Sequence, residues 1–98
     1  MRQRASQIRV TIIGLPTAKV RHAVTNATAA LSQFEGRPRV QWINDIQDIA
    51  TMGSLVVPTI LVNDKPKSVG RIPSVYEFEQ WIEEERHERS ASAVAQVV

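Results

Sequence analysis

The stretch IRVTIIGLPTAKV, residues 8–20, decides the fold of this chain. Its first half alternates β-branched residues and closes on Gly14, which predicts a strand over 8–13. Its second half opens a helix at Pro16 or Thr17, because proline fits a first helical turn and a hydroxyl caps free backbone N–H groups. A strand that runs directly into a helix is the first half of a βαβ unit.

The next apolar residues recur every three or four positions, which predicts one helical stripe that stops before Gly36 and Pro38. The residues of this stripe are Val20, Val24, Ala27, Leu31 and Phe34. A strand is expected over 40–43, and a strand–helix–strand series of this length implies two parallel strands joined by a right-handed crossover. Asp45 then caps a short helix whose apolar residues are expected to point inward: Ile46, Ile49 and Ala50.

A hairpin is expected next. Pro58 opens a strand over 59–62, and the turn Asn63-Asp64 leads to a second run over 68–70. The intervening Lys65-Pro66 pair lengthens the loop between the two runs.

The last helix carries a start signal and an apolar face. Ser74 and Glu77 have the spacing of a capping box, in which each side chain bonds the backbone N–H of the other residue. Its apolar face consists of Val75, Phe78, Trp81 and Ile82. Residues 83–89 are highly charged, which indicates a solvated helix end.

The expected order is therefore β-α-β-(short α)-β-β-α, an α/β domain with a central four-stranded mixed sheet flanked by helices. The first and last helices should cover one face of the sheet and the short helix the other. The hydrophobic content of 43% and charged content of 22% are those of an ordinary folded domain. We expect a basic N-terminal arm over 1–7, the domain itself over 8–89, and a flexible C-terminal tail over 90–98.

The composition excludes several classes of protein. Without cysteine the chain has neither disulfides nor thiol chemistry, and His22 and His87 lie too far apart in sequence to indicate a metal site. No cofactor is expected. The first residues do not resemble an export signal, and no apolar run approaches the roughly 20 residues of a membrane-spanning helix. We therefore expect a cytoplasmic protein that does not enter membranes.

The net charge of +2 is unevenly distributed. Residues 1–43 hold seven Lys/Arg against one Glu, giving +6, whereas residues 44–98 hold five against nine Asp/Glu, giving −4. A polarised domain can orient against a charged partner or a second copy of itself. The basic half lacks interleaved aromatic residues and any helix-turn-helix pattern, so nucleic-acid binding is not expected.

Three stretches, taken in order, resemble a known family: IRVTIIGLPTAKV at 8–20, VVPTILVND at 56–64 and VGRIPSVYEFEQWI at 69–82. Together they are similar to the small archaeal and bacterial thioredoxin- or glutaredoxin-like proteins of under 100 residues. The resemblance spans residues 8–85 and implies a thioredoxin-like fold.

The resemblance also implies which positions of this chain correspond to the family's two cysteines. The two cysteines of the family's Cys-x-x-Cys motif fall on Thr17 and Val20, so the segment reads Thr17, Ala18, Lys19, Val20 and holds no redox nucleophile. No catalytic residue is expected. Pro58 resembles the family's cis-proline, which leaves the backbone of the preceding residue open to a bound peptide; the alternative is a trans proline that only begins a strand. The candidate binding groove comprises Leu15, Pro16, Thr17, Val57, Pro58, Gly70 and Arg71.

These observations favour a redox-inactive thioredoxin-like module that binds a protein or peptide segment, or associates with a second copy of itself, through this groove. One alternative is a glutathione- or small-anion-binding protein, similar to glutathione transferases, that uses Thr17 at the helix N-terminus. Thr17 can equally serve only as the helix cap, and Arg71 can be an ordinary solvated residue. A further alternative is a purely structural subunit, including a homo-oligomer, in which the groove is idle.

Overall fold

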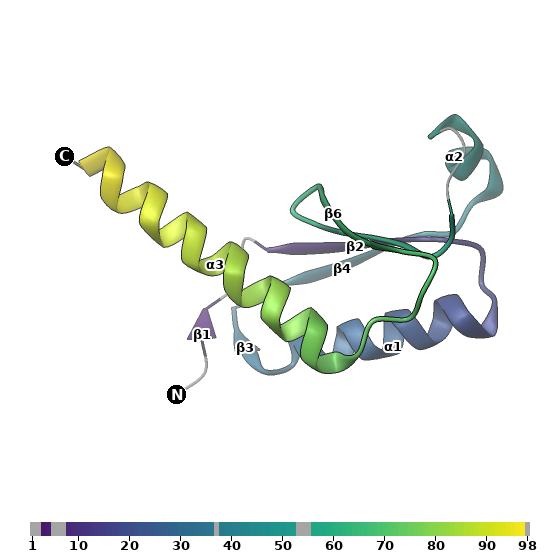
Figure 1. The fold of residues 1–98 in the computed structure, drawn as a ribbon, viewed down its shortest axis with the longest axis horizontal. Coiled ribbons are helices and arrows are strands. Elements are labelled where there is room, and N and C mark those ends of the chain that lie inside the picture. Colours follow the sequence, from purple (N-terminus) through teal and green to yellow (C-terminus); the bar gives the residue numbers. More distant parts are fainter. Residues whose placement is uncertain (1–2, 5–7, 37, 53–55, 98) are drawn as a thin grey trace.

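The computed structural model describes residues 3, 4, 8–36, 38–52 and 56–97, with residues 3, 4 and 88–97 described by their backbone alone. The elements are β1 (Gln3–Arg4), β2 (Arg9–Ile13), α1 (Ala18–Leu31), β3 (Phe34–Glu35), β4 (Arg39–Ile43), α2 (Ile46–Thr51), β5 (Thr59–Val62), β6 (Lys65–Val69) and α3 (Val75–Val97). Figure 1 shows α1 and α3 packed on one face of the sheet, as expected from the sequence.

The predicted four-stranded mixed sheet is confirmed, with the strand order β4-β2-β5-β6. β2 pairs in parallel with β4, so the βαβ crossover through α1 is present, and β2 pairs antiparallel with β5. Ile12 lies opposite Trp42 on one side and Ile60 on the other. β1 and β3 form a separate parallel pair of two residues each. The central strand β2 therefore carries the contacts that join both halves of the chain.

The core lies between the sheet and the helices α1 and α3. Val10 and Ile12 of β2 have no exposed surface and meet the buried face of α1, which includes Val20 and Ala27. Phe78 is fully buried on α3, and its ring packs edge-on against Trp81 with centroids 5.5 Å apart. Burying one such side chain stabilises the fold by about 1.5–3 kcal/mol relative to leaving it in water. This core holds the end of β2 against the start of α1.

The short helix α2 is capped as predicted but does not pack against the sheet as predicted. Asp45 caps α2 as predicted, with its carboxylate accepting from the backbone N–H of Gln47 at 2.8 Å. However, α2 buries no residue, and Ile46 is 67% exposed. The predicted inward packing of Ile46, Ile49 and Ala50 is wrong, because α2 lies beyond the end of the sheet rather than over its second face (Figure 1).

The hairpin is tighter than the sequence indicated. Asn63 and Asp64 both have positive φ angles, 50° and 66°, as a two-residue type I′ turn requires. β6 therefore begins directly at Lys65, and the prediction that Lys65-Pro66 lengthens the loop is wrong. Pro66 is tolerated because β6 is an edge strand, where one missing N–H leaves no neighbour unpaired.

Several element ends also differ from the predictions. α1 ends at Leu31, so Phe34 lies in β3 and not on the helix, although it is buried as expected. Within the proposed arm over 1–7, residues 3 and 4 form β1, and the remaining arm residues lie outside the described part. α3 continues to Val97, where the sequence analysis ended the domain at residue 89. None of the described helices, α3 included, is long and apolar enough to cross a membrane.

The charged end of α3 is less solvated than its sequence indicated. Glu85 is only 3% exposed, and its carboxylate accepts from the ammonium group of Lys65 on β6 at 3.1 Å. Next to it, Lys67 and Glu84 form a looser pair at 3.8 Å, with the Glu84 side chain 58% exposed. Among the described side chains, two ion pairs thus join β6 and α3, and one of them has a buried carboxylate.

Lys65→Met should lower the free energy of unfolding by about 1–2 kcal/mol, because it removes a cation from a buried carboxylate while keeping the apolar stem of the side chain. Lys67→Met is the matched control and should change stability by less than about 0.5 kcal/mol, since its partner is solvated. Urea denaturation followed by circular dichroism measures both. Equal losses in the two variants would contradict the special role of the Lys65–Glu85 pair.

Candidate functional site

The predicted groove begins at Gly14, where β2 ends. Its backbone N–H donates to the carbonyl of Ile43 at 3.0 Å, and its own carbonyl accepts from the indole Nε1 of Trp42 at 2.9 Å. A Cβ at position 14 would lie 2.7 Å from Cγ2 of Val20 and 3.5 Å from Cβ of Val57. Only glycine allows the start of α1 to pack this closely here.

The first turn of α1 occupies the place of the family's redox motif. Thr17 is exposed and caps the helix, with its hydroxyl accepting from the backbone N–H of Val20 at 3.3 Å. Val20 is buried in the core, with 1% of its surface exposed. The two positions that the resemblance assigns to cysteines therefore hold a helix cap and a core side chain.

The segment before β5 forms the second wall of the site. The peptide bond between Val57 and Pro58 is cis, as the resemblance implies. Pro58 is buried, whereas Val57 keeps 40% of its surface exposed. No described residue forms a hydrogen bond with the backbone N–H or C=O of Val57. Among the described residues, neither group is used in the sheet.

The end of β6 forms the third wall. Gly70 donates its backbone N–H to the carbonyl of Pro58 at 2.9 Å, and its φ of 74° lies in the left-handed region that favours glycine. Its carbonyl accepts from the ammonium group of Lys19 in the first turn of α1, at 2.5 Å. The structure therefore brings together residues around positions 14–20, 57–58 and 70, as the predicted groove requires.

Apolar side chains gather around these three segments. Among the described residues, the exposed large hydrophobic side chains are Leu15, Ile46, Met52, Val56, Val57, Val69 and Tyr76. All but Tyr76 belong to segments at one end of the sheet, because Ile13, at the end of β2, lies opposite both Ile43 at the end of β4 and Thr59 at the start of β5. Exposed apolar side chains are therefore concentrated at this end of the molecule, which also carries the exposed carboxylates of Asp45 and Asp48.

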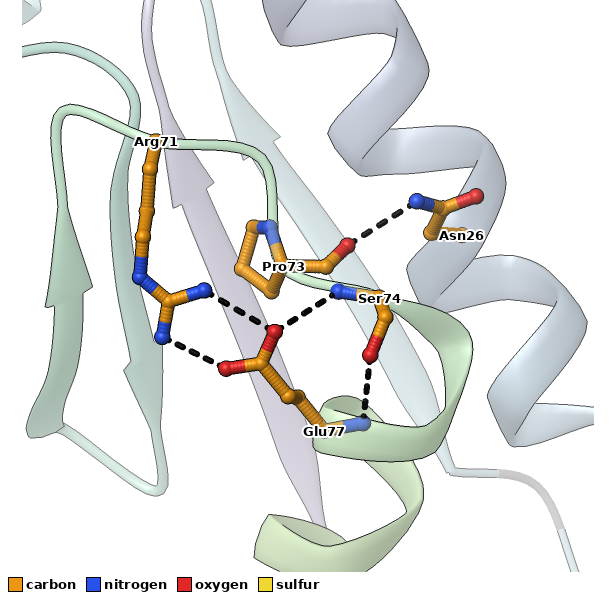
Figure 2. A network of polar contacts seen from close by, with 5 residues as sticks. All are labelled: Asn26, Arg71, Pro73, Ser74 and Glu77. Atoms are coloured by element: carbon orange, nitrogen blue, oxygen red, sulfur yellow. Dashed lines mark hydrogen bonds and ion pairs between the residues drawn. The ribbon is translucent and has the colours of Figure 1, made fainter.

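Arg71 is placed differently from the rest of the predicted groove. Its guanidinium forms two hydrogen bonds to the carboxylate of Glu77 on α3, at 2.9 and 2.5 Å. Figure 2 shows that the same carboxylate accepts from the backbone N–H of Ser74, while the Ser74 hydroxyl accepts from the Glu77 N–H, completing the predicted capping box. Asn26 of α1 anchors the loop by donating to the carbonyl of Pro73 at 2.9 Å (Figure 2). Arg71 therefore fixes the loop between β6 and α3.

The protein-family comparison agrees with this arrangement. The model of the thioredoxin domain matches residues 8–83, which covers the sheet, α1, α2 and the first half of α3. The chain belongs to the thioredoxin domain family. No curated protein and no solved structure matches it. This thioredoxin domain contains no cysteine, so it cannot carry out thiol–disulfide exchange.

The sequence analysis missed Lys19, Val56 and Val69 as parts of the site. One signal was present for Lys19, because a cation in the first turn of a helix is unfavourable next to the helix dipole and calls for a specific partner. The carbonyl of Gly70 is that partner. No comparable sequence signal marked Val56 and Val69, because only the folded arrangement shows that they are exposed next to the groove.

The carboxyl of Glu77 gives this loop a predictable pH dependence. The hydrogen bonds from Arg71, and then that from the Ser74 backbone, lower the pKa of Glu77 from 4.5 to about 2. Because the folded-state pKa is depressed, the carboxylate stabilises the fold above pH 4.5, and this contribution is lost as the pH falls towards 2.

Glu77→Gln should therefore lower the free energy of unfolding at pH 7 by about 1 kcal/mol, a modest value because the ion pair is partly solvated. It should also remove part of the stability decrease of the parent protein between pH 4.5 and 2. Thermal unfolding across this pH range measures both effects. The control is Glu79→Gln, which removes a carboxylate that pairs with no described residue. An unchanged pH profile in the Glu77 variant would refute this assignment.

Proposed function

We propose that this protein is a redox-inactive thioredoxin domain that binds an extended segment of another protein at the groove of Leu15, Thr17, Val57 and Gly70. The observation that carries the proposal is Val57, whose side chain is 40% exposed and whose backbone N–H and C=O bond to no described residue. A residue at the surface whose backbone N–H and C=O bond to no described residue can bind an extended peptide by strand-like hydrogen bonds.

The surroundings of Val57 support an apolar ligand. Leu15 is 40% exposed on one side of the groove, and Val56 and Val69 are 63% and 57% exposed on the other. Exposed apolar side chains that gather at one place typically mark an interaction surface. The nearest cations do not favour an acidic ligand, because Arg71 is neutralised by Glu77 and Lys19 is bonded to the Gly70 carbonyl. The proposed ligand is therefore an extended segment with uncharged, apolar side chains.

Neither alternative has a specific observation in its favour. The glutathione- or anion-binding alternative needs the hydroxyl of Thr17 to donate to a ligand. This hydroxyl accepts the capping hydrogen bond from Val20 and keeps its own hydrogen, so the cap neither supports nor excludes this role. The purely structural alternative predicts an idle groove, and the binding experiment below distinguishes it. The proposal requires no cofactor and places the protein in the cytoplasm, where unfolded or extended segments of other proteins are accessible.

The proposal is tested by selecting ligands from a displayed library of random peptides with the full chain, and by measuring the best peptide by calorimetry. Selected peptides should be rich in apolar residues. Val57→Asp should weaken binding at least about tenfold, because it places a charge in a desolvated contact. Leu15→Asp should act in the same direction.

Tyr76→Asp is the matched control. Tyr76 is 66% exposed and apolar, but it lies on α3 and outside the three segments of the groove. Its substitution should leave peptide affinity unchanged within about twofold, and circular dichroism should confirm that all three variants are folded. A selection without apolar enrichment, or equal binding by the Val57 variant, would refute the proposal.

A further inference from the structure

The outer edge of the four-stranded sheet is β4, and no described strand lies beyond it. Arg39 and Ile43, at its two ends, bond inward to the segment that contains β2, at 3.0 Å each. Because a parallel strand bonds its neighbour through alternate residues, the N–H and C=O groups of Val40 and Trp42 turn to the outer side. These groups bond to no described residue, and such groups on an edge strand are a template for a further strand.

The sequence of β4 is complementary to itself when two copies meet antiparallel about a two-fold axis at Gln41. Val40 then lies opposite Trp42 of the second copy, and such a pair exchanges both of its backbone hydrogen bonds. Arg39 lies opposite Ile43 of the second copy, so no like charges meet. At the axis, two exposed Gln41 amides face each other, and each can donate to the other.

The charges around β4 favour the same antiparallel arrangement. Arg39 at the start of the strand is exposed and forms no ion pair with any described residue. Two exposed carboxylates, Asp45 and Asp48, follow the end of the strand. Antiparallel pairing brings the basic start of each copy next to the acidic end of the other, whereas parallel pairing would align like charges.

We propose that two copies of this chain form a two-fold homodimer by antiparallel pairing of β4, which joins the two sheets into one continuous sheet. The half-buried side chains of Val40 and Trp42 lose further exposed surface in this arrangement. Pro38, just before the strand, has no N–H and so limits the pairing to the strand itself. The interface does not overlap the peptide groove, because β4 contributes no residue to that groove, although the Trp42 indole bonds to the Gly14 carbonyl beside it.

Sedimentation equilibrium of the full chain, from about 5 to about 500 μM, gives the first test. The mass should rise with concentration from 11.0 kDa to twice that value. Amide hydrogen exchange, followed by NMR at both concentrations, then locates the interface. The Val40 and Trp42 amides should exchange at least about tenfold more slowly in the dimer, and the Gln41 amide, which bonds to β2, should change little.

Gln41→Glu places two carboxylates opposite each other at the axis and should weaken dimerisation by about tenfold or more. Gln33→Glu is the matched control, because it makes the same change at an exposed position outside β4 and should leave the dimer intact. Asp45→Asn keeps a good helix cap and removes the negative charge. This substitution should weaken dimerisation at low salt and have little effect on dimerisation at high salt, where ions screen the charge in the parent protein.

A chain that stays monomeric at the highest concentration would overturn the proposal. So would a dimer in which the Val40 and Trp42 amides exchange as fast as in the monomer, since that dimer uses another surface such as α3. Val57→Asp should dimerise normally, so failure of this proposal and failure of the peptide-binding proposal are distinguishable.

Discussion

The absence of a side chain at Gly14 is the constraint on which the site depends. This residue ends the central strand, and a Cβ there would lie 2.7 Å from Val20 and 3.5 Å from Val57. Its two backbone groups bond to Ile43 and to the Trp42 indole, which ties β4 to the same point. The start of α1 can pack this closely because glycine occupies this position, since a Cβ would force the Val20 side chain to shift.

The same convergence explains why the loss of cysteine does not disturb the fold. Thr17 supplies a helix cap, and Val20 adds an apolar side chain to the core. Both roles are structural and neither needs sulfur. Lys19 compensates for its unfavourable place near the helix N-terminus by bonding to the Gly70 carbonyl. The segment over 17–20 thus joins α1 to the end of β6, and the apolar side chains beside it remain exposed.

The order of elements could be predicted because each one has a local cause. Alternation and a closing glycine indicate β2, a stripe of apolar residues indicates α1, and the Ser74–Glu77 capping box indicates the start of α3. The wrong predictions concern side chains whose burial depends on tertiary contacts. Ile46 has the pattern of an inward-facing residue, yet α2 lies beyond the sheet and leaves it 67% exposed. Glu85 lies in a charged run, yet Lys65 on a distant strand allows its burial.

The sequence by itself determined the α/β order, because that order depends on local spacing and on residue type. The resemblance to the family implied that its two cysteines fall on Thr17 and Val20, and it indicated the residues of the candidate groove. Only the tertiary structure decided that Arg71 pairs with Glu77, that Val57 keeps its backbone unbonded among the described residues, and that β4 is an open edge. These three features depend on which segments meet in space. Pairing between distant segments leaves no periodic signal in either of them.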